Sequence, residues 1–131
     1  SLLGLSAQRL ARRLCPICKT EHTLTPEEWV ALGGSPVNTS VTLYQAVGCQ
    51  ACAQKGYSGR ISLAEIIRID AGLKQRIDEQ QPTSNLKRYL KEQGVILMRQ
   101  DGLMKAQAGL TSIEEVGRVV QLEVGEALDD A

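Results

Sequence analysis

Phenylalanine is absent from this 131-residue chain, which has only three tyrosines and one tryptophan. A core built mainly from aromatic side chains is therefore excluded, and Leu, Ile, Val and Ala must fill the interior. Leu, Ala, Gln, Glu, Lys and Arg are plentiful, and these residues favour helix over strand. The composition predicts a mainly helical chain with room for one ordinary domain or two very small ones.

Net charge is absent as well, because 15 basic residues balance 15 acidic ones. The charge of the whole chain would therefore not concentrate nucleic acid or anionic lipid around it. The apolar runs are a few residues long, far below the roughly 20 residues that span a bilayer, and we expect no secretory leader because no charged-then-apolar stretch is seen. We expect a soluble protein with no transmembrane segment and no affinity for nucleic acid.

The charges that are present are unevenly distributed along the chain. Residues 1–60 hold six basic and three acidic side chains, whereas residues 61–131 hold nine and twelve. Residues 123–131 carry four acidic side chains and no basic one, which predicts a solvated acidic tail. At the other end, the sequence starts with Ser1 rather than Met, in the middle of a predicted helix, and we interpret the chain as a piece of a longer polypeptide.

All four cysteines fall into two C-x-x-C pairs, Cys15 with Cys18 and Cys49 with Cys52. Two residues between paired cysteines allow both sulfurs to face inward on one tight turn. Two such turns can place four thiolates at the corners of a tetrahedron, which Zn²⁺ accepts with zinc–sulfur bonds of about 2.3 Å. Because four protein ligands close the coordination shell, the pattern predicts structural zinc rather than a catalytic metal.

The same residues have alternative interpretations. Two disulfides would suit a small secreted domain, but this chain has no leader. A redox-active C-x-x-C ordinarily comes as one pair in a thioredoxin-like β-α-β unit, and here there are two pairs. Iron stays open, because tetrahedral thiolate sites accept either metal. His22 is a conceivable substitute ligand, but four cysteines already complete a site, so we expect an ordinary surface histidine.

The first half of the chain combines predicted helices with short strands. Apolar residues recur at helical spacing over residues 3–14, which predicts an amphipathic helix leading into the first cysteine pair. The segment 25–28, Thr-Pro-Glu-Glu, is typical of a capping box and predicts a short helix that the glycines at 33–34 end. We expect residues 41–44 to form a strand and residues 61–69 to form another that pairs with it.

Beyond Asp70 the pattern predicts helices alone. The expected segments are residues 71–79, 82–94, 97–108 and 111–122, the last opened by a capping box of Thr111 and Glu114. The expected fold class is therefore α+β and mainly helical. We divide it into a helix at 1–14, a tetracysteine zinc-binding subdomain with a short hairpin at 15–69, a helical cluster at 70–122 and the acidic tail at 123–131.

Several motifs in a fixed order make the sequence resemble a known family. They are Gln8-Arg9-Leu10-Ala11-Arg12-Arg13-Leu14-Cys15-Pro16-Ile17-Cys18, Val47-Gly48-Cys49-Gln50-Ala51-Cys52, Gly56-Tyr57-Ser58-Gly59-Arg60-Ile61 with Glu65, Asp101-Gly102-Leu103-Met104-Lys105, Gly109-Leu110-Thr111 and Glu114-Glu115-Val116. Together they resemble the C-terminal part of the type II secretion and type IV pilus assembly ATPases. The resemblance extends over residues 7–120.

The resemblance implies a hexameric, RecA-like motor in the bacterial cytoplasm that converts ATP hydrolysis into work on pilin or pseudopilin assembly. The implied partners are the ATPase core of the same polypeptide, which the helix at 1–14 would continue, neighbouring subunits of the hexamer, and an inner-membrane platform. Through these partners the motor would lie at the periphery of the inner membrane. The chain has no G-x-x-x-x-G-K-[ST] phosphate loop, so ATP and Mg²⁺ are expected only in the parent protein.

Arg9, Arg12 and Arg13 are the remaining candidate site residues. Guanidinium groups commonly bind phosphate and carboxylate, so these arginines are candidates for contact with nucleotide or with a neighbouring subunit. A solvated basic helix face is the competing expectation. We expect no catalytic residue in the chain. Local structural roles are expected for Gly56, Tyr57, Gly59, Glu65 and Lys105.

Two functions are consistent with these observations. The first is a non-catalytic zinc-binding module of a secretion or pilus assembly ATPase, which supports subunit assembly and couples ATP hydrolysis to the inner-membrane machinery. The second is a free-standing zinc-ribbon adaptor for proteins or nucleic acid. The balanced charge, without a basic stripe interleaved with aromatic residues, counts against nucleic acid.

Overall fold

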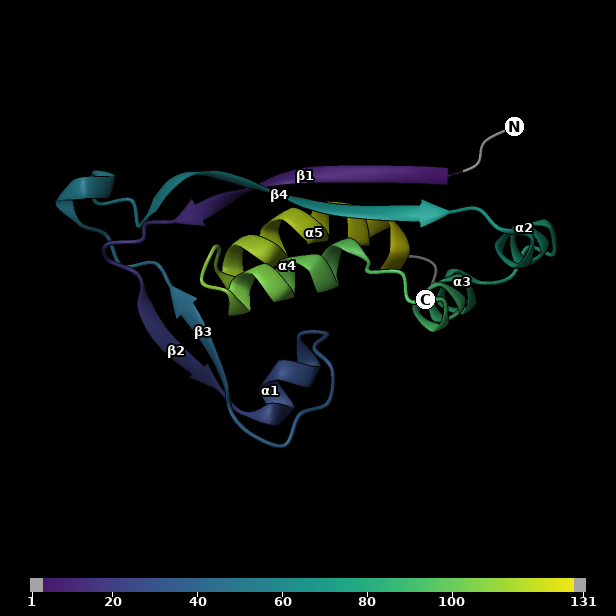
Figure 1. The fold of residues 1–131 in the computed structure, drawn as a ribbon, viewed down its shortest axis with the longest axis horizontal. Helices are drawn as coiled ribbons and strands as arrows, with labels where there is room; N and C mark the ends of the chain where they lie inside the picture. The colour runs from purple at the N-terminus through teal and green to yellow at the C-terminus, as the bar shows by residue number, and fades with distance from the viewer. Residues whose placement is uncertain (1–3, 129–131) are drawn as a thin grey trace.

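The computed structural model describes residues 4–128, with side chains described for residues 4–120 (Figure 1). The elements are β1 (Gly4–Leu14), β2 (Thr20–Leu24), α1 (Pro26–Ala31), β3 (Val41–Gln45), the 3₁₀ turn η1 (Gln50–Cys52), β4 (Tyr57–Arg68), α2 (Ala71–Asp78), α3 (Thr83–Glu92), α4 (Met98–Gln107) and α5 (Ile113–Leu128). The α+β class is confirmed. Helix is less dominant than predicted, because β1 and β4, of 11 and 12 residues, are longer than every described helix except α5.

Two antiparallel ribbons of two strands each make up the β structure of the described residues. β1 pairs with β4, from Gly4 opposite Arg68 to Leu14 opposite Tyr57. β2 pairs with β3 along their whole length. Figure 1 shows α4 and α5 along one side of the β1–β4 ribbon, with the β2–β3 ribbon at one end of the molecule and α2 and α3 at the other.

The helix predicted over residues 3–14 is wrong, because these residues form β1. Ala7 and Ala11 both pack toward the core. Their spacing of four residues fits one face of a helix and equally one face of a strand, so the apolar pattern does not separate the two. Pairing with the long strand β4 satisfies the backbone of both segments, and this tertiary pairing overrides the helix propensity of the sequence.

The strand predicted at residues 61–69 is confirmed as β4, but its predicted partner is wrong. The segment predicted at 41–44 forms β3 and pairs with β2 rather than with β4. The chain between β3 and β4 folds into the turn that carries the second cysteine pair, and this turn sends the two strands into different ribbons. The sequence did not indicate β2, whose first four residues are exposed and show no apolar alternation.

The predicted starts of α1 and α2 are confirmed. In α1, Thr25 Oγ1 accepts a hydrogen bond from Glu28 N at 3.1 Å, and the Glu28 carboxylate accepts one from Thr25 N at 2.9 Å. This reciprocal pair is the predicted capping box. At the start of α2, Asp70 Oδ1 accepts from Leu73 N at 2.7 Å. In both helices a side chain satisfies an N–H group that the first turn leaves unpaired.

The last helix begins with a different cap from the one predicted. Ser112 rather than Thr111 supplies the capping oxygen, because Ser112 Oγ accepts from Glu115 N at 3.1 Å. The predicted capping box of Thr111 and Glu114 is therefore wrong, and the cap lies one residue later. The predicted acidic tail is helical as far as Leu128, and the three residues after it lie outside the described part of the chain. Within that part, no helix is both long and apolar enough to cross a bilayer.

One hydrophobic cluster joins both ribbons to α1, α4 and α5. Its buried members are Ala11, Leu24, Trp29, Val41, Leu43, Leu63, Met98, Leu103, Ala106, Val116, Val119 and Val120. α4 and α5 pack closely at Gly102, where an added Cβ would lie 2.7 Å from Val116 Cγ1 and 3.2 Å from Leu63 Cδ1. Because the core is continuous, it holds the two ribbons, α1, α4 and α5 in fixed relation to each other.

Candidate metal centre

The four cysteine sulfurs meet where β1 and β3 end. All four Sγ atoms lie within 4.8 Å of one another. The Sγ–Sγ distance is 3.8 Å between Cys15 and Cys49, 3.8 Å between Cys18 and Cys52, and 3.7 Å between Cys49 and Cys52. A tetrahedral metal with sulfur bonds of about 2.3 Å requires sulfurs about 3.8 Å apart. The cluster therefore has the dimensions to hold a tetrahedral metal ion.

The cysteines are free rather than joined as disulfides. A disulfide brings its two sulfurs to about 2.05 Å, far closer than the separations in this cluster. His22 lies exposed on β2 opposite Leu43 and does not belong to the cluster. The donor set is four sulfurs, which suit either Zn²⁺ or iron by donor type.

Backbone N–H groups of two glycines hold the sulfurs in place. Gly48 N donates to Cys18 Sγ at 3.3 Å, and Gly56 N donates to Cys52 Sγ at 3.2 Å. Gly48 and Gly56 have φ angles of +115° and +81°, in the left-handed region that favours glycine. A Cβ at Gly48 would also lie 2.8 Å from the carbonyl oxygen of Gln54. The second cysteine turn therefore requires glycine at both positions.

Local surroundings shift the thiol pKa values of Cys52 and Cys18 in opposite directions. Burial alone raises the pKa of Cys52, but N–H groups of Cys49 and Gly56 that donate to its sulfur outweigh burial and lower this pKa to about 6. At Cys18 burial prevails and raises the pKa to about 11. Metals bind the thiolate, so a metal ion bound by this cluster would displace the protons that its sulfurs carry.

The two cysteine turns lie at the points where the chain crosses between the ribbons. The first turn connects β1 to β2, and the second connects β3 to β4. Since β1 pairs with β4 and β2 with β3, each ribbon supplies one strand to each turn. The backbone joins the turns as well, because Cys15 N donates to the carbonyl of Gly56 at 3.0 Å. A metal held by both turns would tie the two ribbons together at a single point.

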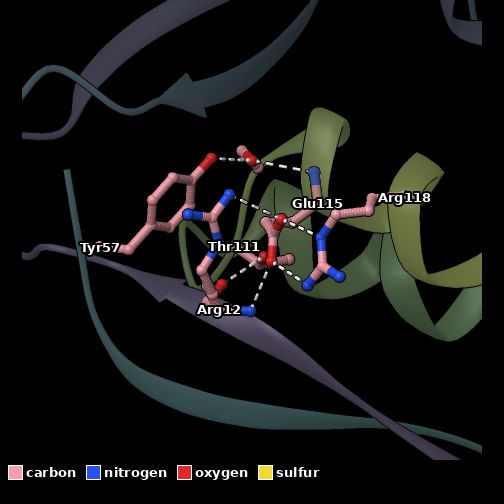
Figure 2. Close-up of polar contacts among 6 residues, drawn as sticks. Arg12, Tyr57, Thr111, Glu115 and Arg118 are labelled. Atoms are coloured by element: carbon pink, nitrogen blue, oxygen red, sulfur yellow. Dashed lines mark hydrogen bonds and ion pairs between the residues drawn. The ribbon is translucent and has the colours of Figure 1, made fainter. Parts of the chain in front are cut away.

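The candidate arginines Arg9, Arg12 and Arg13 lie on β1, so the expected basic helix face does not exist. Arg12 instead belongs to an internal network (Figure 2). Its backbone N–H donates to Glu115 Oε1 at 2.8 Å, and its Nη2 donates to Glu115 Oε2 at 3.1 Å. Its guanidinium lies 4.2 Å from the centre of the Tyr57 ring. Contact of the three arginines with nucleotide or a neighbouring subunit stays a prediction.

Glu115 is the centre of this network, and sequence reasoning did not single it out. Its residue is 1% exposed, and its carboxylate also accepts from Arg118 Nε at 2.8 Å and Arg118 Nη2 at 2.9 Å. The hydrogen bonds from Arg118, opposed by burial and reinforced by those from Arg12, lower the pKa of Glu115 to about 2. The carboxylate therefore stays ionised at neutral pH and clamps the start of α5 to the end of β1.

Hydroxyl groups add further hydrogen bonds to the Glu115 network. Thr111 Oγ1 donates to the carbonyl of Arg12 at 2.8 Å, and the hydroxyls of Tyr57 and Ser112 lie 2.7 Å apart (Figure 2). Tyr57 is the first residue of β4 and follows the second cysteine turn directly. The network thus connects α5 with both strands of the long ribbon, next to the cysteine cluster.

Glu65 and Lys105 make the local pairings expected of them. Glu65 Oε1 on β4 accepts from Met98 N, at the start of α4, at 2.8 Å. Lys105 Nζ donates to Asp101 Oδ2 at 2.8 Å and to the carbonyl of Ser62 at 2.6 Å. Both contacts fasten α4 to β4 rather than forming a reactive site.

The sequence matches known proteins over nearly its whole length. The family described as type II/IV secretion system protein matches residues 1–118. The chain is 40% identical over 123 residues to the type IV pilus assembly ATPase TfpB of Acinetobacter baylyi. It is 37% identical over 121 residues to the type II secretion system ATPase E of Vibrio cholerae, and 38% over 117 residues to the type IV pilus assembly ATPase PilB of Pseudomonas aeruginosa.

These matches cover between 88% and 93% of this chain but only between 20% and 24% of each relative. The chain therefore spans between a fifth and a quarter of the length of these relatives. Pilus and secretion proteins match it about equally well, so the comparison assigns the family without choosing between the two systems. The match over residues 1–118 and the motif order agree, and the chain belongs to the type II/IV secretion system protein family.

Proposed function

We propose that this chain is a non-catalytic, zinc-binding module from the C-terminal part of a hexameric secretion or pilus assembly ATPase. The observation that carries the proposal is the tetrahedral spacing of four sulfurs at the junction of the two ribbons, in a member of this family. The residues that would hold Zn²⁺ are Cys15, Cys18, Cys49 and Cys52.

The metal's proposed role is structural. Four thiolate ligands leave no open position for water or substrate, and zinc in such closed sites contributes folding free energy rather than catalysis. We favour zinc over iron because zinc has no redox chemistry and is the usual metal of closed four-cysteine sites. In this role the metal would fix the angle between the two ribbons.

ATP binding and hydrolysis are assigned to the rest of the parent protein. The three relatives are named as ATPases, and the matched segments make up between 20% and 24% of their lengths. This chain contains no G-x-x-x-x-G-K-[ST] phosphate loop, whose backbone and lysine grip the β- and γ-phosphates. ATP and Mg²⁺ would therefore bind in an ATPase core that belongs to the same polypeptide.

The module's proposed task is mechanical. The continuous core and the Glu115 network fasten both ribbons, α1, α4 and α5 into one body, and the metal would strengthen it. A displacement of the ATPase core that reached β1 would then be transmitted to neighbouring subunits of the hexamer and to an inner-membrane platform. In a flexible module the same displacement would be lost. This task places the protein in the cytoplasm, at the periphery of the bacterial inner membrane.

The proposal is tested in the full-length parent protein with all four cysteines changed to serine. The expected result is loss of secretion or pilus assembly, with impaired hexamer formation or a loss of coupling between ATP turnover and transport. Gln50→Ser is the matched control, because Gln50 is exposed in the second cysteine turn and supplies no ligand. A four-cysteine variant that drives transport as well as wild type contradicts the mechanical role, and ATP turnover by the 131-residue chain contradicts the non-catalytic role.

A further inference from the structure

The two cysteine turns expose aliphatic side chains that the metal cluster does not need. Ile17 is 72% exposed and Val47 is 59% exposed, and Pro16 is exposed beside them. Ile17 and Val47 directly precede Cys18 and Gly48, whose sulfur and N–H are in contact at 3.3 Å. The two aliphatic residues therefore lie on adjacent parts of the turns. We call Pro16, Ile17 and Val47 the apolar tip.

The two chain segments that carry the apolar tip hold basic residues and no acidic one. Residues 4–20 and 41–64 contain no Asp or Glu and hold all the basic residues of the first sixty, Arg9, Arg12, Arg13, Lys19, Lys55 and Arg60. Glu115 balances Arg12, but within the described residues Arg13, Lys55 and Arg60 form no ion pair. A zinc ion with four thiolates would add two negative charges, which these cations still outnumber.

The strand register puts these cations close to the tip. Cys15 N is hydrogen-bonded to the carbonyl of Gly56, so Arg13 and Lys55 lie on the two segments that lead away from the cysteine turns. Arg60 lies opposite Arg12 in the β1–β4 ribbon. In Figure 1 the end of the molecule at η1 projects beyond the helices and is remote from α2 and α3. The structure therefore presents a projecting aliphatic tip with basic residues on the chain segments that adjoin it.

We propose that the apolar tip docks on the surface of an anionic lipid bilayer. Ile17 and Val47 would enter the headgroup region, while Arg13 and Lys55 would remain at the level of the lipid phosphates. Apolar insertion and attraction to anionic lipid reinforce each other in this kind of contact. The surface of a bilayer adapts its shape to a projecting tip, whereas a protein partner would need a pocket whose shape is complementary to the tip. The lipid contact is additional to the protein platform of the proposed function and requires no ATP.

The test is co-sedimentation of the metal-loaded chain with lipid vesicles. We expect binding to vesicles of equal parts phosphatidylethanolamine and phosphatidylglycerol, little binding to phosphatidylcholine alone, and a loss of binding as salt is raised. Ile17→Ser should weaken binding about ten-fold. Lys55→Gln should weaken it about five-fold, the effect of one cation near an anionic surface.

Two matched variants serve as controls. Ile66→Ser removes a side chain that is 75% exposed on β4 opposite Ser6, far along the ribbon from the cysteine turns, and should bind like wild type. Lys74→Gln removes an exposed lysine of α2, at the opposite end of the molecule, with the same change in net charge as Lys55→Gln. If Ile17→Ser lost the metal, Val47→Ser would replace it in the comparison.

Each of four outcomes would overturn the lipid proposal. The wild-type chain could bind neither kind of vesicle. It could also bind both kinds of vesicle equally. The tip variants could weaken binding no more than Ile66→Ser and Lys74→Gln do. A chain that ignores vesicles but binds an acidic protein through Ile17 would assign the tip to a protein partner instead.

Discussion

Replacing Glu115 by glutamine should destabilise the fold severely, although the substitution removes no atom from the core. The carboxylate is buried and accepts four hydrogen bonds, from Arg12 N and Nη2 and from Arg118 Nε and Nη2. Glutamine has one acceptor oxygen and presents an N–H₂ group to the two guanidinium groups. The change therefore removes the charge that compensates two arginines and leaves some of their donors without an acceptor.

The expected magnitude follows from the pKa of Glu115. That pKa is lowered from 4.5 to about 2 in the folded protein. Each pKa unit corresponds to about 1.4 kcal/mol. Folding therefore stabilises the charged form of Glu115 over its protonated form by about 3 kcal/mol. The Arg12 and Arg118 side chains are each 52% exposed, so water screens these pairs and the value is an upper limit. We expect Glu115→Gln to lose up to about 3 kcal/mol of unfolding free energy at neutral pH.

Urea unfolding followed by circular dichroism measures this loss, with Glu114→Gln as the matched control. Glu114 is the exposed neighbour of Glu115 and should change the unfolding free energy by less than about 0.5 kcal/mol. The reasoning is refuted if the two variants have the same unfolding free energy. It is also refuted if Glu115→Gln matches wild type, because the network would then contribute nothing to stability.

The same substitution has a predictable pH dependence. Because folding depresses the pKa of Glu115, its contribution is fully present above the unfolded value of 4.5 and is lost as pH falls toward 2. The difference in unfolding free energy between wild type and Glu115→Gln should therefore be constant near neutral pH and should narrow below pH 4.5. Taking the difference at each pH removes the effect of acid on the cysteines, which both proteins share.

Three further changes test the packing, the capping and the metal. Gly102→Ala should cost about 1–3 kcal/mol in urea unfolding because its Cβ would meet Val116, whereas Gly117→Ala, which has open space, should be neutral or stabilising by up to about 1 kcal/mol. Thr25→Ala should cost about 1 kcal/mol by removing one half of the capping box of α1, read from thermal unfolding. Cys49→Ser should raise amide exchange across residues 15–60 and leave the C-terminal helices partly protected; unchanged protection in the cysteine turns would mean that the metal is dispensable.

The two cysteine turns were predictable from sequence because the geometry of each C-x-x-C pair is local. Two residues between Cys15 and Cys18, and between Cys49 and Cys52, fix the sulfurs on tight turns whatever the surrounding fold. The capping residues Thr25 and Asp70 were predictable for the same reason, since each acts within one helical turn. Features that depend on a few neighbouring residues can therefore be inferred without knowing the tertiary structure.

The features that sequence reasoning missed depend on contacts between distant segments. β1 has an apolar spacing that fits helix and strand alike, and only its pairing with β4, about fifty residues away, decides between them. Glu115 lies beside Glu114, and both fit a capping box, with Ser112 or with Thr111. Arg12 on β1 decides between the two cap positions, because its backbone N–H donates to Glu115 and its carbonyl accepts from Thr111. No local sequence pattern reveals these contacts with β1.

The metal content of the purified protein tests the central claim most directly. We predict one Zn²⁺ per chain, bound by Cys15, Cys18, Cys49 and Cys52, with no disulfide among them. Less than about half an equivalent of any thiolate-bound metal, with the cysteines joined as disulfides instead, would contradict it.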